Sequence, residues 1–93
     1  MVHRIYVICE KGGDPKSIYV GCTTRKLPVR LREHRYDTKR SFSRFHTYMR
    51  EKGPEKFEMK LLEEVDRGKL DAAFAEKWWS TLLGARLNER SPC

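Results

Sequence analysis

Residues 4–22 read RIYVICEKGGDPKSIYVGC, and this stretch decides the fold. Both ends are runs of β-branched and aromatic residues, which fit a pleated surface, and the break Gly12-Gly13-Asp14-Pro15 separates them. The stretch therefore predicts a β-hairpin. If the hairpin is centred on Gly12 and Gly13, Tyr6 lies directly opposite Tyr19. A slip of one residue would place the two phenols on opposite faces of the sheet.

Two helices are predicted after the hairpin. Residues 27–34 form the first, with Thr24 placed to cap its start. The second begins at Ser41 or Ser43 and ends at Lys52, where a glycine and a proline follow. Its expected inward side chains share one helical face: Phe42, Phe45 and Met49.

A third strand and a last helix complete the predicted order. Phe57, Met59 and Leu61 recur at a period of two, which predicts a strand with one buried face. The last helix is expected from Gly68 to Leu83, with an inner side that comprises Leu70, Ala73, Phe74, Trp78 and Leu82, widened by Trp79 and Leu83. The order β-β-α-α-β-α predicts an α+β fold, a small three-stranded sheet flanked by helices, as a single domain over residues 1–93.

The positive charge of the chain is concentrated in its first half. The net charge is +7 over 93 residues, and residues 1–50 hold 12 Lys/Arg against 4 Asp/Glu. Residues 51–93 hold 8 Lys/Arg against 9 Asp/Glu. A one-sided basic field favours a polyanionic partner such as DNA, although a basic face that only meets solvent is the alternative.

The sequence carries no sign of a membrane segment or an exported state. The longest apolar run, residues 5–9, is far too short to span a bilayer. No N-terminal stretch has the layout of a signal peptide, so a cytoplasmic, intracellular protein without membrane contact is expected. The three cysteines are odd in number and lack the spacing of a zinc site, which favours reduced thiols.

Five side chains form a set with a shared chemistry. Arg30 and His34 lie one helical turn apart on the first helix, and Glu76 lies on the last helix. Together with Tyr6 and Tyr19, they provide the phenols, guanidinium, imidazole and carboxylate that hydrolysis of a phosphodiester with one metal ion would require. The set points to nucleic-acid cleavage.

At these residues the chain resembles the GIY-YIG nuclease superfamily. Arg4-Ile5-Tyr6 matches the first family motif with its glycine replaced, and Tyr19-Val20-Gly21 matches the second with valine for isoleucine. The helical Arg30/His34 pair, Glu76 and Asn88 follow in the family order, and the match covers essentially the whole chain. The chain looks closest to the catalytic domains of phage-type intron-homing endonucleases. The resemblance implies cleavage of DNA by water attack that leaves 5′-phosphate and 3′-hydroxyl ends.

Each catalytic candidate has an expected role and an alternative. Glu76 would hold Mg²⁺ or Mn²⁺, or would be a surface glutamate paired with a lysine. Arg30 would stabilise charge on the phosphate, with His34 beside it, or both would lie on a solvated helix face. Tyr6 and Tyr19 would activate water, helped by Arg30, His34 and a metal ion that favour the phenolate, or would only pack in the sheet.

The resemblance refines some of these roles and adds others. It implies that Tyr6 is the general base, that Tyr19 is a positioning group, and that Asn88 supports the site by hydrogen bonding. Gly21 is expected to allow a close approach of the backbone to the site. Exposed basic residues are expected to hold the phosphate backbone of DNA: Arg25, Lys26, Lys39, Arg40 and Arg44.

Two other functions compete with the nuclease. The chain could be a catalytically inactive nucleic-acid-binding module of the same fold, or an interaction or inhibitor protein that uses its basic face. Phosphate contacts carry no base sequence, and members of the family often gain specificity from an appended DNA-binding domain, which this sequence is not expected to contain. We therefore expect a weakly specific or structure-directed nicking enzyme, a subunit that forms a homodimer, the catalytic part of a longer protein, or an enzyme that acts with a separate DNA-recognition partner.

Some members of the family carry a second histidine after the first helix, and near that position this chain offers Lys39, Arg40 and, further on, His46. His46 has no evident partner in the sequence, and no role is assigned to it.

Overall fold

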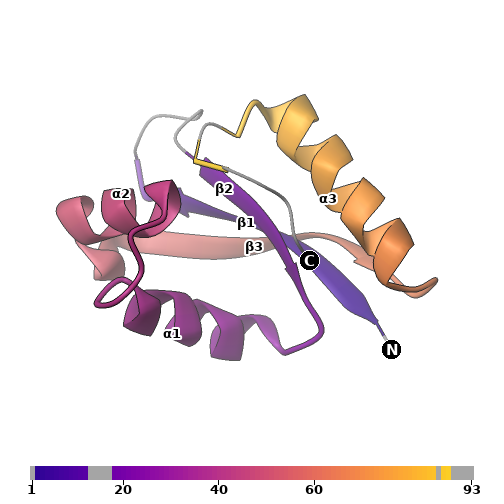
Figure 1. The fold of residues 1–93 in the computed structure, drawn as a ribbon, viewed down its shortest axis with the longest axis horizontal. Coiled ribbons are helices and arrows are strands. Elements are labelled where there is room, and N and C mark those ends of the chain that lie inside the picture. The colour runs from indigo at the N-terminus through magenta and orange to yellow at the C-terminus, as the bar shows by residue number, and fades with distance from the viewer. Residues whose placement is uncertain (1, 13–17, 86, 89–93) are drawn as a thin grey trace.

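The computed structural model describes residues 2–12, 18–85 and 87–88. The elements follow the predicted order, with a short 3₁₀ turn (η1) added before the third strand (Figure 1). Their bounds are β1 His3–Glu10, β2 Ile18–Thr23, α1 Leu27–Asp37, α2 Arg44–Lys52, η1 Pro54–Lys56, β3 Phe57–Val65 and α3 Lys69–Leu83. The strands form one antiparallel sheet in the order β2-β1-β3. The predicted α+β class is confirmed.

The register of the β1–β2 hairpin differs from the predicted one by two residues. Tyr6 pairs with Gly21, and Tyr19 pairs with Ile8. The direct Tyr6–Tyr19 pairing is therefore wrong, and residues 13–15 of the expected turn lie outside the described residues. Because side chains alternate with a period of two, a shift of two keeps both tyrosines on one face as diagonal neighbours. Their ring centroids are 6.4 Å apart.

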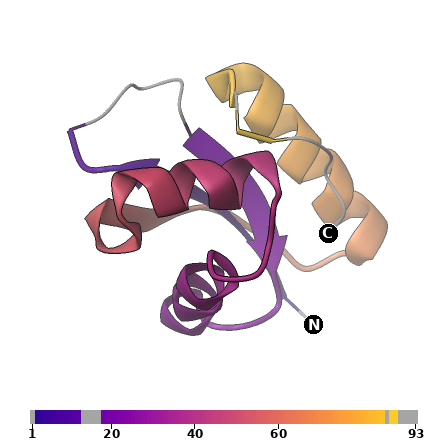
Figure 2. The same cartoon turned by 60° about the vertical axis from the view of Figure 1, so that its left-hand side comes forward.

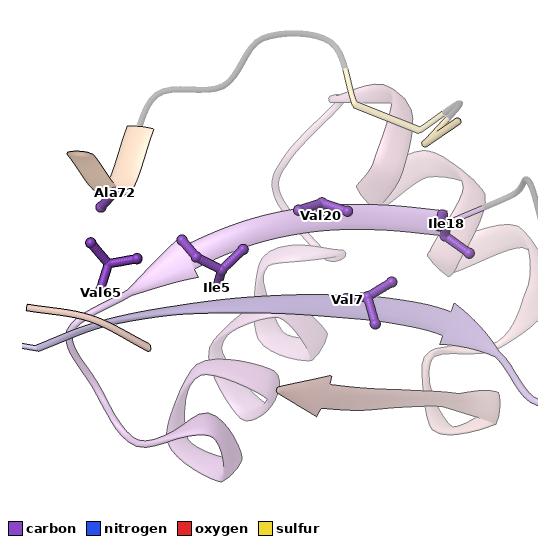
Figure 3. Close-up of a cluster of buried hydrophobic side chains, with 6 residues drawn as sticks. All are labelled: Ile5, Val7, Ile18, Val20, Val65 and Ala72. Atoms are coloured by element: carbon purple, nitrogen blue, oxygen red, sulfur yellow. The ribbon is translucent and has the colours of Figure 1, made fainter. Parts of the chain in front are cut away.

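Helices cover both faces of the sheet, and each face has its own core. α3 lies on one side of the sheet, and α1 with α2 on the other (Figures 1 and 2). Figure 3 shows the cluster on the α3 side, which comprises Ile5, Val7, Ile18, Val20, Val65 and Ala72. The cluster on the α1–α2 side comprises Tyr6, Ile8, Phe45, Met49, Phe57 and Leu87. The odd–even alternation of β1 thus divides its side chains between two cores.

The start of α1 is held without the predicted threonine cap. Lys26 occupies the N-cap position and makes no side-chain capping bond. Thr23 Oγ1 instead accepts the Arg25 backbone N–H, and Arg4 donates to the carbonyl oxygens of Thr24 and Arg25. These contacts fix the loop between β2 and α1, so Thr24 is not needed as a cap. The helix also continues three residues past the predicted end at His34.

The second helix begins at the later of the two predicted positions. Ser43 is the N-cap, and its hydroxyl oxygen accepts the His46 backbone N–H. Phe45 and Met49 are buried as predicted, but Phe42 precedes the helix and is 87% exposed. The prediction for Phe42 is wrong because the serine cap starts the helical turn one residue after it.

A β-bulge alters the alternation in β3. Tyr6 pairs with Leu61, and Ile5 pairs with Glu63, so Leu62 is an extra residue in the strand. Phe57 is buried toward α2, whereas Leu61 is 47% exposed. The prediction of one buried face is confirmed at Phe57 and is wrong at Leu61, which lies just before the bulge. After the bulge, Val65 packs into the core on the α3 side.

The last helix buries a face that agrees with the predicted one at Trp79 and Leu83 and differs from it at most other positions. Ala72 and Glu76 are buried, and Ala75, Trp79 and Leu83 pack against the core. The predicted inner residues Leu70, Phe74, Trp78 and Leu82 are all more than half exposed. α3 is apolar around much of its circumference, so periodicity does not decide which side meets the sheet. The small side chains of the buried side let the helix approach closely.

Two further expectations concern the cysteines and membranes. Cys9 carries a free thiol, but Cys22 is disulfide-bonded, so the expectation of reduced thiols is wrong for Cys22. Among the helices of the described ranges, none is long and apolar enough to cross a membrane.

Replacing Phe45 by alanine should cost far more stability than replacing Phe42. Phe45 is buried and stacks on Tyr19 with ring centroids 4.2 Å apart, so Phe45→Ala should lower the free energy of unfolding by about 3–5 kcal/mol. Phe42→Ala should lower it by less than about 1 kcal/mol, the value of its contact with Arg50. Urea denaturation of both variants measures the difference. Equal losses would contradict the start of α2 at residue 44.

Candidate active site

Two strands and one helix bring four of the predicted residues together. Tyr6 comes from β1, Tyr19 from β2, and Arg30 and His34 from one side of α1. The Tyr6 Oη and His34 Nε2 atoms are hydrogen-bonded at 2.7 Å. His34 packs edge-on against both tyrosines, with ring centroids 5.9 Å from Tyr6 and 5.5 Å from Tyr19. The one-turn spacing of Arg30 and His34 therefore places both side chains toward the tyrosines.

Gly21 creates the space in which the two tyrosines meet. A Cβ atom at Gly21 would lie 2.5 Å from the Tyr6 hydroxyl oxygen and 2.8 Å from the Tyr19 ring. Real Cβ contacts are never that short, so any other residue would displace a ring. The close approach expected at Gly21 is thus made by the side chains of Tyr6 and Tyr19.

Burial keeps both phenols protonated. Desolvation is the largest effect on the pKa of Tyr6 and raises it well above the usual value of about 10; Tyr19 also raises it, and Arg30 opposes them. The pKa of Tyr19 is raised mainly by burial and then by Glu76. The charge of Arg30 favours the phenolate as expected, because it lowers the pKa of both tyrosines, but desolvation outweighs it.

His34 is a neutral imidazole. Burial, then Arg30, then His46 lower its pKa to about 3, and its side chain is only 1% exposed. A neutral ring has one N–H and one acceptor nitrogen. His34 can therefore accept the Tyr6 hydroxyl proton at Nε2 when its own proton is on Nδ1, where a hydrogen-bond partner would hold it.

His46 provides that partner, and the sequence interpretation missed it. His34 Nδ1 and His46 Nε2 are 3.0 Å apart, and His46 Nδ1 lies 2.9 Å from Ser43 Oγ. The signal was the spacing Ser43-x-x-His46, which is that of a capping box with histidine in place of the acid.

Glu76 is a buried carboxylate on the inner side of α3. It is 1% exposed, which excludes the alternative of a surface glutamate. Its negative charge raises the pKa of both Tyr6 and Tyr19, so it belongs to the same electrostatic neighbourhood. In the part of the chain that the structure describes, no three His, Cys, Asp or Glu side chains form a metal cluster. A cation here would have Glu76 as a single protein ligand, an arrangement that suits Mg²⁺.

Asn88 binds the outer edge of β2. Its Oδ1 accepts the Val20 backbone N–H at 2.9 Å, and its Nδ2 donates to the Val20 carbonyl oxygen at 2.7 Å. The Leu87 backbone N–H donates to the Ile18 carbonyl oxygen. Asn88 thus holds the strand that carries Tyr19 and Gly21 without contacting either side chain through these bonds.

Arg30 connects the buried tyrosines with the protein surface. It lies close enough to Tyr6 for its positive charge to lower the pKa of the phenol. It also lines a shallow hollow of about 420 Å³ together with Arg32, Glu33, Tyr36 and Asp37. On the hollow side, Arg30 Nη1 is 3.4 Å from Glu33 Oε1. A phosphate could therefore reach Arg30 from the surface by replacing Glu33.

The other predicted basic residues are exposed and flank the site. Lys26 precedes α1, and Lys39 and Arg40 follow it, so they lie on the order of 16 Å apart along the helix axis. Arg25 pairs with Glu33, and Arg40 contacts Tyr36. Arg44 opens α2. These residues do not converge on the tyrosines; they extend the positive surface to both sides of them.

Comparisons with other sequences agree with this arrangement. The sequence model of the GIY-YIG catalytic domain matches residues 2–88. The MSV199 domain-containing protein 146R of Invertebrate iridescent virus 6 is 44% identical over 63 residues, which make up 67% of this chain and 25% of that protein. The chain thus spans about a quarter of the length of that curated relative.

Solved structures show the same fold. The catalytic domain of homing endonuclease I-TevI gives a TM-score of 0.74 at 21% identity, with 98% of both chains covered. A mutant of the catalytic domain of intron endonuclease I-TevI gives a TM-score of 0.71 at 22% identity, with 97% of this chain and 92% of that chain covered. At these identities the likeness concerns the fold alone.

The neutral state of His34 should make the protein sensitive to mild acid. An unfolded histidine has a pKa of about 6.5, so below that pH the unfolded chain binds a proton that folded His34 does not bind until about pH 3. Stability therefore falls as the pH falls. Between pH 7 and 5, His34 should remove about 2 kcal/mol from the free energy of unfolding, which urea titrations at both pH values measure.

Two variants separate this effect from that of other titrating groups. His34→Gln should lose about 2 kcal/mol less than the wild type over the same pH range. His3→Gln is the matched control and should keep the wild-type dependence. If His34→Gln and the wild type lose equal stability, His34 is not neutral in the folded protein.

Proposed function

The chain belongs to the GIY-YIG nuclease family, and on that basis we propose that it is an endonuclease that hydrolyses DNA phosphodiester bonds with one divalent cation. The observation that carries the proposal is the hydrogen bond between Tyr6 and His34, with Arg30 on the open side. A phenol, an imidazole and a guanidinium in contact can remove a proton from water while they hold a phosphate.

Arg30 binds the scissile phosphate in this mechanism. A guanidinium presents a fixed fork of donors that matches phosphate oxygens, and this one is accessible from the surface hollow. It stabilises the charge that builds on the phosphate during attack, an effect of a few kcal/mol for a well-placed donor. Glu33 holds the guanidinium in position until a phosphate replaces it.

Tyr6 removes the proton from the attacking water. Its own hydroxyl proton passes to His34 Nε2, 2.7 Å away, as the oxygen takes up the water proton. The oxygen so released forms the bond to phosphorus, the bond from phosphorus to the 3′ oxygen breaks, and the 3′ oxygen takes a proton from solvent. The products carry 5′-phosphate and 3′-hydroxyl ends. Tyr19 and Gly21 fix the position of the Tyr6 ring, and Asn88 fixes β2.

Glu76 would hold the cation, Mg²⁺ or Mn²⁺. Its carboxylate oxygens are the ligand type that these ions prefer, and its charge acts on both tyrosines. When bound, the cation supplies neutralisation of charge on the phosphate and the leaving oxygen.

The exposed basic residues around α1 would bind the DNA backbone. Contacts to phosphates position the substrate without reading its sequence. Specificity would therefore require a second copy of the chain or a separate DNA-recognition partner. The length of the viral relative, of which this chain spans 25%, is compatible with a further recognition segment.

Replacing Glu76 by glutamine should abolish metal-dependent cleavage. Glu76→Gln keeps the shape of the side chain but removes the charge that would bind the cation, so nicking of supercoiled plasmid should fall by a factor on the order of 10² or more. Glu51→Gln, which removes the same charge at an exposed position of α2, is the control and should cleave like the wild type.

The outcomes separate the competing functions. Cleavage that needs Mg²⁺ or Mn²⁺, stops with chelator and is lost only in Glu76→Gln supports the nuclease. Metal-independent cleavage, or equal activity of the two variants, refutes the role of Glu76. DNA binding without cleavage by the wild type would indicate an inactive binding module.

Removing two lysines beside α1 should reduce the salt dependence of DNA binding. Each phosphate contact contributes about −0.9 to the slope of log K against log salt. Lys26→Ala combined with Lys39→Ala should therefore reduce the slope by about 2, measured by fluorescence anisotropy in chelator. The control, Lys69→Ala with Lys77→Ala on α3, removes the same charge and should keep the wild-type slope. Equal slopes in both double variants would place the DNA elsewhere.

A further inference from the structure

We propose that two copies of this chain pack against each other through the outer face of α3, with the two α3 helices antiparallel. The outer face is defined by Leu70, Phe74, Trp78 and Leu82, on the side of the helix opposite the buried Ala72 and Glu76. Its four side chains are 58–71% exposed. The interface itself does not depend on the nuclease function.

The exposed apolar surface of the described residues is concentrated on this helix. Seven large hydrophobic side chains are exposed there, and four of them form the outer face of α3. Because the four recur at intervals of four residues, they form a continuous row along the helix. Single apolar side chains on a surface are ordinary, whereas a contiguous apolar patch marks a place of contact.

The row is large enough to form the apolar centre of a dimer interface. An aromatic side chain covers roughly 150–250 Å², so the four side chains at their observed exposure offer an apolar patch on the order of 400 Å². A standard interface buries about 800 Å² on each partner. The row therefore supplies about half of that area, and the polar residues around it supply the rim.

The order of residues in the row favours a second copy as the partner. The row reads aliphatic, aromatic, aromatic, aliphatic from either end, and its midpoint, residue 76, is also the centre of α3. In an antiparallel pair, Leu70 lies opposite Leu82 of the second copy, and Phe74 lies opposite Trp78. A two-fold interface needs a self-complementary surface of this kind, because the same patch is used on both subunits.

The charges at the ends of α3 favour the same arrangement. Arg67 and Lys69 are exposed at the start of the helix, and its last turn holds no basic residue. The carboxyl end of a helix carries a partial negative charge. Antiparallel packing brings the two cations of each copy toward the negative helix end of the other. Parallel packing would place the cations of both copies side by side.

A hollow beside the row gives the second copy a place to dock. It has a volume of about 400 Å³ and is lined by Glu63, Arg67, Asp71, Phe74, Ala75 and Trp78. In the antiparallel pair, the Leu82 side chain of the second copy lies next to this hollow.

The basic half of the chain stays out of the contact. Residues 1–50 have a charge balance of 12 − 4 = +8, whereas residues 51–93 have 8 − 9 = −1. α1 and α2 lie on the other side of the sheet from α3 (Figures 1 and 2), so the copies meet through their least charged parts. If the chain is the proposed nuclease, the dimer supplies the second copy that specificity requires. This consequence alone rests on the proposed function.

Sedimentation velocity tests the interface. The wild type should sediment with twice the 11.1 kDa mass of one chain. Phe74→Glu and Trp78→Glu should each raise the Kd of the dimer by a factor on the order of 10² or more, because a charge then enters the apolar centre from both copies. Phe42→Glu, at an aromatic residue that is also exposed but lies outside the row, is the matched control and should dimerise like the wild type.

The outcomes are distinct. A wild type that stays monomeric up to about 0.1 mM, where a complex with a Kd near 1 μM would be formed, overturns the proposal and leaves the row to another protein or to a further part of a longer chain. Dimers that persist in both Phe74→Glu and Trp78→Glu, or that are lost equally in Phe42→Glu, also overturn it. Circular dichroism checks that each variant is folded.

Cross-linking tests the antiparallel orientation. A photoreactive group at residue 70 should react with the end of α3 around Leu82 in an isotope-labelled second copy. Reaction with the start of that helix would contradict the orientation. Plasmid nicking by the same proteins is a separate readout: a dimer that does not cleave supports the interface and refutes the nuclease, and a monomer that cleaves does the reverse.

Discussion

The hydrogen bond between Tyr6 and His34 is the contact on which the arrangement of the site depends. It joins β1 to α1 beside a cluster of buried apolar side chains, where an unsatisfied hydroxyl or imidazole would be costly. The bond therefore fixes the rotation of α1 about its own axis. Once His34 is fixed, Arg30 one turn earlier must face the same strands, and Glu33 is left on the outer side beside it. A single polar contact thus determines which face of α1 carries the residues of the candidate active site and which face is exposed to solvent.

Packing around this bond leaves little freedom. Tyr6 lies over Gly21, Tyr19 stacks on Phe45, and His34 stands edge-on to both tyrosines. Dense packing lets a site hold rings in one orientation, but it also removes water and raises the pKa of both phenols. The interior that positions Tyr6 therefore prevents it from ionising. A site built this way must move protons along hydrogen bonds, because stable ions are disfavoured inside it.

Much of this fold could be predicted from residue patterns, and the errors have physical causes. The hairpin, the order of elements and the placement of Arg30 and His34 follow from alternation, helical spacing and turn residues. The predicted register was wrong by two residues, because the register of a hairpin depends on the length and type of its loop. Composition alone does not determine that loop. The inner face of α3 was wrong because apolar residues surround that helix. His46 was missed because its partner is twelve residues away, on another helix, and only folding brings the two rings together.

The pairing of Leu87 and Asn88 with β2 has a consequence beyond support of the site. An edge strand exposes backbone donors and acceptors that can recruit a strand from another molecule. Here the Ile18 carbonyl and both polar groups of the Val20 backbone are already occupied. The segment after α3 therefore protects the open edge of the sheet from growing by addition of foreign strands. Loss of that segment would make the domain prone to aggregate even if every catalytic side chain remained in place.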